Sequence, residues 1–546
     1  MDENQKYQEI SKKIVEIVFK YNPNIAAYLG KEEYEKEVSS GTREYYEEFV
    51  TQFTQAINEL KQLDVTKLNL DNRLAFNVLE KSHAIFQFLH ETFPLWKKVP
   101  LGVDDIQTTI FVLLQRKGPT NHVAEVVIAQ LSKLPNFLEE FRSRFDSPIP
   151  SIWKETALIM IQFVPSFFQF LANVFNSSNI PESLKESLSK AIKEAEPAIK
   201  VHTDWIQRLP VDEDEFAWAL GTKNFEKLLS LRQLPWDRGT ILKKGYALLE
   251  SLTNRAKKIA KEIDPSKSYE EVIEDLKAEH PPTFEMVLEH ARSESERAKE
   301  FITNQGLATI PEESLVVAET PLYLTPVIPF AMYGPTPYFD PKQPGIYYIT
   351  PTKDDEGLKR HSYADISNVM VHEAYPGHHL DFVWNNKSAP LSNLIAFYFS
   401  LIGDETVEGW AHYCEEMMLQ QGFHEDPKKA ELVILRGQIW RAVRIVVDIE
   451  LHCKQRTVED AVKMLVEKAQ MEAAAATAEV RRYTASPAQP LSYLIGKLLI
   501  QELKQDIEQK MGDKFNLKFF HDTILQSGDL PYSLLKELFE EKIKDI

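Results

Sequence analysis

Apolar side chains recur along most of the chain at spacings of three and four residues, which is the period of an α-helix. One such stripe consists of Phe49, Phe53 and Ile57. The same pattern continues through the N-terminal half and resumes after residue 359. We therefore expect a mainly α fold, with helices in residues 12–21, 45–63, 184–206, 240–263 and 269–299.

The helical pattern stops between residues 310 and 352, where nine prolines fall. Proline lacks an amide hydrogen and clashes with the preceding turn, so helix is excluded over most of this segment. Two short runs in it, residues 322–324 and 346–350, have the aromatic and aliphatic composition of strands. We expect a small β element here, joining a helical N-terminal half (residues 1–309) to a second half (residues 310–546), either as two domains or as one continuous body.

Charge and cysteine content argue against a nucleic-acid-binding protein and against a disulfide-rich secreted one. The 82 acidic and 63 basic residues give a net charge of −19, whereas nucleic-acid binding needs a cationic surface, so we expect no nucleic-acid partner. Only two cysteines occur, Cys414 and Cys453, which excludes a disulfide framework and favours a cytoplasmic location. We expect both to be buried thiols.

Two segments are considered as a possible signal peptide or membrane-spanning helix. The first residues show no basic region followed by an apolar one, so no signal peptide is expected. Residues 156–175 are notably apolar, but Gln162, Pro165 and Gln169 interrupt them. This pattern favours a buried pair of helices over a membrane span, and we expect no membrane partner. No pattern in the sequence indicates the oligomeric state.

A histidine cluster is the main candidate for chemistry. Catalytic zinc is bound by three histidine or carboxylate side chains plus water, and in the motif H-E-x-x-H the glutamate is the base. Here Glu373 directly follows His372, which predicts a zinc site with Glu373 as general base. The alternative is a group of ordinary core histidines. Four of the fourteen histidines lie within 41 residues: His372, His378, His379 and His412.

The spacing of these histidines departs from H-E-x-x-H by two residues. On an unbroken helix His378 would lie ~120° around from His372, and His379 would lie ~20° around but ~10 Å further along. Pro376 would break the helix, and Gly377 permits unusual backbone angles. A break there would return His378 to the position of the second ligand. We favour His378 over His379, which stays the alternative.

A third ligand is expected downstream, where an acidic helix follows. Its ionisable residues share one helical stripe and are flanked by strongly apolar sequence. Buried ionisable groups need partners, and a metal ion is a suitable one. The alternative is a solvated acidic face. The stripe consists of Glu405, Glu408, His412 and Glu415.

Three motifs together resemble a known family. They are His-Glu-Ala-Tyr-Pro-Gly-His-His-Leu at residues 372–380, Glu-Gly-Trp-Ala at 408–411, and Arg-Tyr-x-x-x-Pro-x-Gln at 482–489, followed by Tyr493 and Gly496. They are similar to those of the family called domain of unknown function 885. That family is grouped with the zinc peptidases of the gluzincin type, and its domain is long enough to cover most of this chain.

The resemblance implies a large, two-lobed, mainly α metallopeptidase-like fold, with residues 310–546 as the metal-binding catalytic half. It further implies that His372 and His378 bind the metal and that Glu408 is the third ligand. Glu373 matches the base of the family. The chain departs from the family pattern, outside these residues, at Asp381, His412 and Ala488.

The expected function is zinc-dependent hydrolysis of peptide bonds in short peptides. Tyr483, Tyr493 or Arg482 could stabilise the oxyanion, and the alternative for each is a structural contact at a helix end. Residues 346–350 form either a strand that pairs with an extended peptide or an ordinary edge strand. Two other functions stay open: hydrolysis of a non-peptide amide at the same metal, and a non-catalytic helical scaffold with a structural metal or none.

Overall fold

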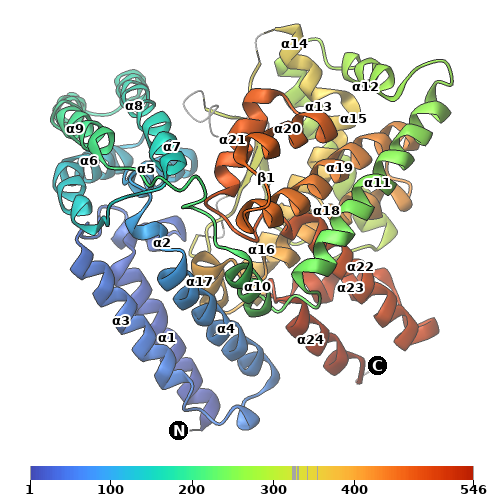
Figure 1. Cartoon of the computed structure of the whole chain (residues 1–546), viewed down its shortest axis with the longest axis horizontal. Coiled ribbons are helices and arrows are strands. Elements are labelled where there is room, and N and C mark those ends of the chain that lie inside the picture. Colours follow the sequence, from blue (N-terminus) through green and yellow to red (C-terminus); the bar gives the residue numbers. More distant parts are fainter. Residues whose placement is uncertain are drawn as a thin grey trace. The chain divides into compact units, whose positions relative to one another are not determined.

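The computed structural model describes residues 2–321, 328, 331–340, 342, 344–352 and 354–544. The chain forms two compact units. Unit 1 comprises Met1–Trp218 and Pro337–Gln343, and unit 2 comprises Ala219–Thr336 and Pro344–Ile546. The mainly α fold expected from the sequence is confirmed, since the described residues outside one small sheet form helices, turns and loops (Figure 1).

Unit 1 is helical, and α1 packs against α3 while α6 packs against α9. Helices predicted at residues 12–21, 45–63 and 184–206 are present as α1, α3 and α9. Side chains of Asp2 and Thr42 cap the first two of these by accepting hydrogen bonds from free amides. The helices are α1 (Glu3–Tyr21), α2 (Pro23–Tyr28), α3 (Arg43–Leu60), α4 (Leu70–Thr92), α5 (Asp104–Lys117), α6 (Asn121–Phe141), α7 (Ser151–Ile161), α8 (Val164–Ser177) and α9 (Glu182–Arg208).

The apolar stretch of unit 1 is a helix pair, as expected, but most of the pair is not buried, which differs from the expectation. Residues 151–177 are long and apolar enough to cross a membrane by length and composition alone. The chain is divided between α7 and α8 at Gln162 and Phe163. Only 33% of the most apolar window is buried. Each helix therefore buries one face, and side chains such as Ile159 and Met160 remain exposed.

Unit 2 holds the remaining helices. The segment 269–299 was expected to be one helix but forms two, α12 and α13, because Pro281 and Pro282 lie between them. The helices are α10 (Thr222–Leu231), α11 (Arg238–Ile263), α12 (Tyr269–Ala278), α13 (Phe284–Gln305), α14 (Asp355–Leu358), α15 (Tyr363–Glu373), α16 (His378–Ser388), α17 (Leu391–Ser400), α18 (Asp404–Gln420), α19 (Pro427–His452), α20 (Val458–Ala469), α21 (Ala473–Tyr483), α22 (Ser492–Met511), α23 (Leu517–Leu525) and α24 (Tyr532–Lys544).

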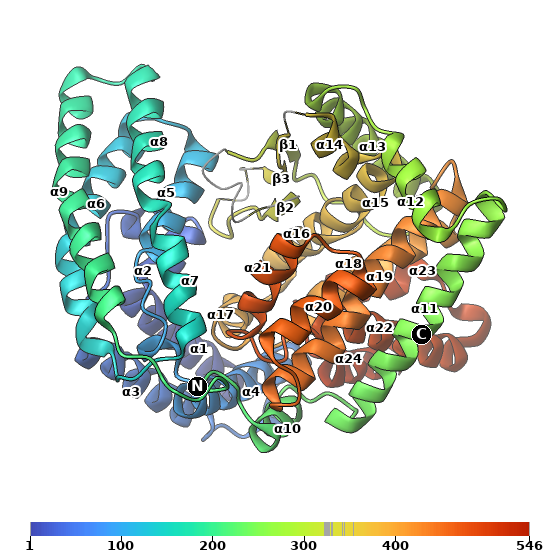
Figure 2. The same ribbon diagram turned by 45° about the horizontal axis from the view of Figure 1, so that its top comes forward.

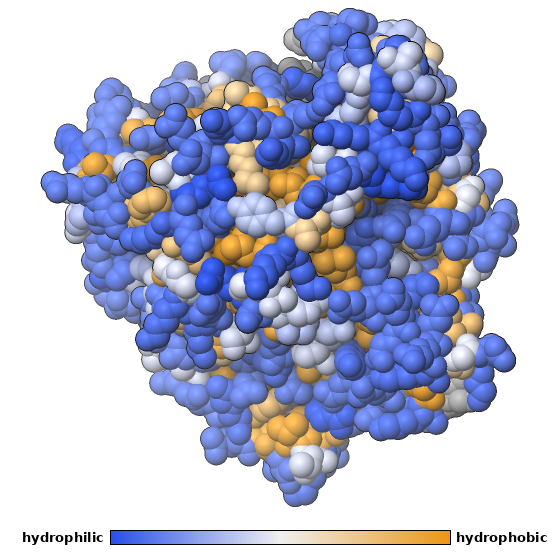
Figure 3. All heavy atoms as spheres, turned by 45° about the vertical axis from the view of Figure 1, so that its right-hand side comes forward, coloured by the Kyte–Doolittle hydropathy of each residue, from blue (hydrophilic) through white to orange (hydrophobic). Residues whose placement is uncertain are grey.

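Helix α19 forms the centre of unit 2. It is buried along most of its length and packs against α11, α18 and α22 (Figure 2). Helix α13 packs against α15 in the same unit. For this reason the chain divides after Trp218, and not near residue 309 as the change of sequence pattern led us to expect. The face of the molecule in Figure 3 is mostly hydrophilic, with hydrophobic side chains gathered in patches between polar ones.

The small sheet of unit 2 has the order β1-β3-β2. Its strands are β1 (Leu315–Glu319), β2 (Ala331–Gly334) and β3 (Gly345–Ile349), with β1 parallel and β2 antiparallel to β3. The strand expected at residues 346–350 is thus present as β3, but it is the central strand. Its edges are already paired, so β3 cannot accept a peptide strand. The run 322–324 lies outside the described residues.

Helices α18 and α22 approach closely through two glycines. A Cβ on Gly409 would lie 2.3 Å from the backbone carbon of Gly496, and a Cβ on Gly496 would lie 1.9 Å from the backbone oxygen of Glu405. Any side chain at either position would therefore force the helices apart. The crossing brings Tyr493 of α22 beside His412 of α18, with ring centroids 6.0 Å apart.

We expect Gly496→Ala to destabilise the protein by roughly 1–3 kcal/mol, because the added methyl group overpacks this crossing. The matched control is Gly239→Ala in the first turn of α11, where a Cβ would meet nothing closer than Asp237 at 3.7 Å. Denaturant unfolding of both variants measures the effect. Equal stability of the two variants would contradict the close packing.

Candidate metal centre

The first two residues of the site lie in the last turn of α15. The hydroxyl of Ser362 caps the start of this helix by accepting a hydrogen bond from the amide of Asp365. The helix ends at Glu373, so His372 and Glu373 are adjacent to a change in chain direction. His372 is buried, while Glu373 keeps partial exposure.

The chain breaks between α15 and α16 at Ala374–Gly377, the position predicted from Pro376 and Gly377. A Cβ on Gly377 would lie 1.8 Å from the carbonyl oxygen of His372, so only glycine fits. The indole nitrogen of Trp410 donates a hydrogen bond of 2.9 Å to the Pro376 carbonyl. The break places His378 at the start of α16, with its ring centroid 4.8 Å from that of His372.

Helix α18 brings a carboxylate to this histidine pair. His378 Nε2 lies 3.6 Å from Glu408 Oε2, a buried oxygen for which no hydrogen bond was found among the described residues. One nitrogen or oxygen from each of His372, His378 and Glu408 lies within 4.8 Å of the other two. Two imidazoles and a carboxylate that converge in this way are the donor set of catalytic zinc. The three side chains fit a metal ion.

A second carboxylate orients His372. His372 Nδ1 donates a hydrogen bond of 2.7 Å to Glu415 Oε1, which leaves Nε2 of the same ring free to bind a metal. His412 Nδ1 lies 3.0 Å from the same oxygen. His372, His412 and Glu415 also lie close enough together to hold a metal. However, their shared oxygen already accepts a hydrogen bond from His372, so the set with Glu408 is the better candidate.

The His378–Glu408 pair has shifted proton affinities. Burial alone would lower the pKa of His378, but the nearby carboxylate of Glu408 outweighs it and raises this pKa to about 8. Burial would raise the pKa of Glu408, and the neighbouring histidines instead lower it to about 2. Without a metal, the pair is therefore an imidazolium beside a carboxylate. A metal ion would replace that proton.

Two other predicted ligands lie elsewhere. His379 Nδ1 is 3.0 Å from the Tyr333 hydroxyl, and burial lowers the pKa of His379 to about 4. Of the two histidines, His378 is therefore the one that lies beside His372 and Glu408. Glu405 forms an ion pair with Arg232, with Nε and Oε1 3.0 Å apart. It is therefore engaged away from the histidine pair.

The three candidates for oxyanion stabilisation differ in their contacts. The Tyr483 hydroxyl accepts a hydrogen bond from Arg444 and donates one to Glu479, at 2.8 and 2.6 Å. Arg482 pairs with the same Glu479 and donates to Gln489. These contacts match the structural alternative for both residues. Tyr493 lies beside His412, and the charge of Glu408 contributes to the rise of the Tyr493 pKa to about 12, after burial.

Sequence reasoning missed Arg444 and Glu479. Both are buried or half-buried, and they join Tyr483 to the centre of α19. The Arg444 guanidinium also lies over the Tyr493 ring, 4.4 Å from its centroid. An arginine within a strongly apolar helix is the signal that could have identified this residue, because a buried guanidinium needs partners.

The site opens into a cavity of about 800 Å³ in unit 2. His372, Glu373 and Glu415 line it, together with residues of α19 and the segment between α20 and α21. Among the described residues, no hydrogen bond or ion pair to the Glu373 carboxylate was found. This carboxylate is therefore free to act on a bound molecule.

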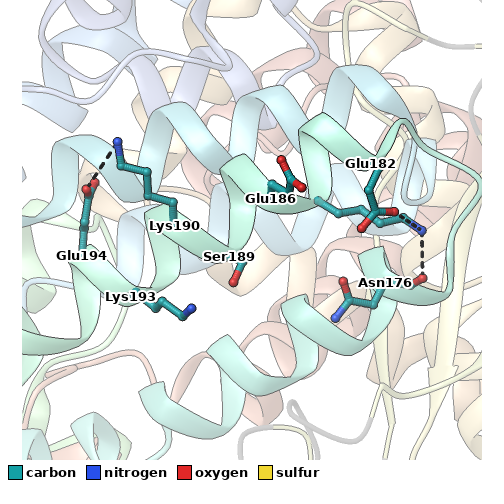
Figure 4. Close-up of a pocket in the computed structure, with 8 residues that line it drawn as sticks. Asn176, Glu182, Glu186, Ser189, Lys190, Lys193 and Glu194 are labelled. Atoms are coloured by element: carbon teal, nitrogen blue, oxygen red, sulfur yellow. Dashed lines mark hydrogen bonds and ion pairs between the residues drawn. The ribbon is translucent and has the colours of Figure 1, made fainter.

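A second hollow lies between α8 and α9 of unit 1 (Figure 4). Its charged side chains pair along α9, with Lys190 3.8 Å from Glu194 and Lys185 3.9 Å from Glu182. Neither histidine nor cysteine lines it. Such exposed pairs are ordinary helix-surface contacts, and this hollow carries no candidate chemistry. Both cysteines of the chain, Cys414 and Cys453, are buried free thiols as expected.

Comparison with protein families gives one match. The family model described as "Bacterial protein of unknown function (DUF885)" matches residues 23–539, nearly the whole chain. The chain belongs to this family. A search of curated proteins found no significant match.

Solved structures share the fold of this DUF885 chain. One, described as a putative lipoprotein from Colwellia psychrerythraea, has a TM-score of 0.85 and 19% identity, with 100% of each chain covered. Another, described as a putative lipoprotein of unknown function from Shewanella oneidensis, has a TM-score of 0.78 and 20% identity, covering 98% of this chain and 99% of its own. At these identities the similarity extends to the fold alone.

The raised pKa of His378 predicts a pH effect in protein stripped of metal by a chelator. Protonated His378 stabilises the fold fully below pH 6.5, and this contribution is lost as the pH rises through about 8. The free energy of unfolding should therefore fall by about 1–2 kcal/mol more in wild type than in His378→Gln between pH 6.5 and 9. His379→Gln is the control, because His379 is neutral throughout this range. Equal slopes for wild type and His378→Gln would contradict the pairing.

Proposed function

We propose that this protein is a zinc-dependent hydrolase that cleaves peptide bonds in short peptides. The observation that carries the proposal is the convergence of His372, His378 and Glu408, with Glu373 directly beside them. The resemblance of the sequence motifs to gluzincin-type peptidases supports the same reading. A structural metal site has no use for a free carboxylate next to its ligands, which favours catalysis over a scaffold.

The three ligands would leave a fourth position of a tetrahedral zinc open. Zinc held by these three ligands would bind a water molecule at the open position. It would lower the pKa of that water to about 7 and polarise the carbonyl of a substrate. Glu415 holds the His372 ring through Nδ1 and so fixes which nitrogen faces the metal. His412 lies against the same carboxylate oxygen. His412, one of the departures from the family pattern, therefore lies beside the proposed ligand His372 and contacts the carboxylate that orients it.

Glu373 would act as general base. It lines the cavity, keeps partial exposure and follows a ligand residue directly. In this position its carboxylate can accept a proton from water and return it to the leaving amine.

Tyr493 would donate a hydrogen bond to the oxyanion. Its hydroxyl accepts a hydrogen bond from Gln489 at 3.2 Å and keeps its own proton for donation. The raised pKa of this phenol keeps it protonated at neutral pH. Arg444 lies over the ring and holds it in place. A donor of this kind contributes ~3 kcal/mol in known cases.

Two other functions are less well supported. A non-peptide amide could be hydrolysed by the same residues, and a panel of peptide and non-peptide amides separates the two. A helical scaffold would need neither Glu373 nor the cavity. A cytoplasmic location remains a prediction from the sequence.

The first test is the metal content. Purified protein is expected to contain about one zinc per chain by inductively coupled plasma mass spectrometry. His378→Ala should lose most of this zinc, whereas His379→Ala should retain it, because His379 contacts Tyr333 instead. Zinc retained by His378→Ala, or none in wild type even after zinc is added, would overturn the proposed site.

The second test separates catalysis from metal binding. Glu373→Gln should lower kcat on a short peptide by at least about 10²-fold, because the amide cannot accept the proton from water. Its zinc content should match that of wild type, because Glu373 is not a ligand. Glu472→Gln is the matched control: Glu472 lines the same cavity but pairs with exposed Arg360. Wild-type activity in Glu373→Gln would show that Glu373 is not the general base.

A further inference from the structure

One arginine in the cavity forms no close ion pair with any of the described residues. Arg441 of α19 lines the cavity together with His372 and Glu373. Among the described residues, no carboxylate was found within 4.0 Å of its guanidinium nitrogens. Its Nε is buried without a hydrogen-bond partner, and its one backbone contact, to Gly437, is long at 3.4 Å.

The other cations that line this cavity are all paired. Each has a carboxylate oxygen within 3.3 Å of its charged nitrogen. Arg441 is therefore the exception, although it is half-buried like most of them. The pairs are Lys277 with Glu274, Lys359 with Glu356, Arg360 with Glu472 and Arg436 with Asp365.

The position of Arg441 is fixed by its neighbours. Its guanidinium carbon lies 4.2 Å from the centroid of the Trp440 ring, so the planar group rests on the indole. Arg444 lies over the same ring, also at 4.2 Å, but its charge is satisfied by Glu479. Burial of a cation without a partner is unfavourable, and an anionic ligand would remove that cost.

Two further polar atoms in the cavity wall lack partners. The indole nitrogen of Trp440, a donor, and the side-chain oxygen of Asn368, an acceptor, are buried with no hydrogen bond among the described residues. Buried polar atoms are nearly always bonded, so unpaired ones that line one cavity indicate a ligand. The set offers a cation and a neutral donor to a carboxylate, and an acceptor to an amide N–H.

We propose that Arg441 and Trp440 bind the C-terminal carboxylate of a short peptide, and that Asn368 accepts a hydrogen bond from its last peptide N–H. This inference rests on the proposed function, and it makes the enzyme one that cleaves near the C-terminus of its substrate. A guanidinium binds a carboxylate through two parallel hydrogen bonds, which gives both affinity and orientation. A cavity of about 800 Å³ matches a ligand of a few residues.

The test is peptide binding, which does not depend on turnover. Glu373→Gln protein, with its zinc, is titrated by isothermal calorimetry with acetyl-Ala-Ala-Ala and with its C-terminal amide. We expect the free acid to bind at least tenfold more tightly than the amide. Acetyl-Ala-Ala-Glu amide, which carries only a side-chain carboxylate, should bind like the neutral amide. Equal binding of acid and amide, or tight binding of the side-chain carboxylate, would overturn the proposal.

Variants separate Arg441 from zinc, which could itself attract a carboxylate. In the same Glu373→Gln background, Arg441→Met should abolish the preference for the acid, and Arg441→Lys should reduce it. Arg360→Met is the matched control, because it removes a paired cation from the same cavity. A preference retained in Arg441→Met would refute the inference. The comparison of the free-acid and amide peptides uses protein with Arg441 intact. It therefore tests the proposal even if Arg441→Met fails to fold.

The two proposals can fail independently. If peptides with a free C-terminal carboxylate and peptides with a C-terminal amide were hydrolysed at equal rates, the proposed peptidase activity would stand and the role of Arg441 would be refuted. Binding that depends on Arg441 in a protein with no zinc and no hydrolysis would support the carboxylate site and refute the peptidase.

Discussion

The close contact between Gly377 and the carbonyl of His372 is the constraint on which the site depends. A side chain at residue 377 would collide with that oxygen at 1.8 Å, so the chain can turn this tightly only with glycine there. The turn converts a spacing of six residues into neighbouring imidazole rings. Trp410 fixes the turn from outside by its hydrogen bond to Pro376. Because Glu408 lies two residues before Trp410 on the same helix, α18 positions both the turn and the carboxylate that we propose as third ligand.

The surroundings of this turn hold buried charges that are mostly paired. Glu415 is buried and contacts two histidines, Arg232 pairs with Glu405, and Arg444 pairs with Glu479. Such groups are costly to bury and are weak as a source of stability, but they are common where chemistry takes place. Two of these carboxylates, Glu405 and Glu415, lie on α18, whose backbone approaches that of α22 closely at Gly409 and Gly496. Arg441 stands out against this background, because its partner is missing among the described residues.

The helical fold could be predicted largely from the period of apolar residues, and the helix break from Pro376 and Gly377. The choice between His378 and His379 needed the structure, since it depends on how far the chain turns back at Gly377. The division after Trp218 could not be predicted, because it follows from long-range packing of α11 on α19. The same limit applies to Tyr483. Its motif suggested catalysis, but its hydroxyl contacts Glu479 one turn earlier in α21 and Arg444 across helices, on α19.

The central claim is that one metal site is formed by His372, His378 and Glu408. Anomalous diffraction at the zinc edge, from crystals of the protein as purified, tests it most directly. We expect a single peak per chain, about 2 Å from a nitrogen of each histidine and from a Glu408 oxygen. A peak between His412 and Glu415, or a peak bound by His379, would contradict it.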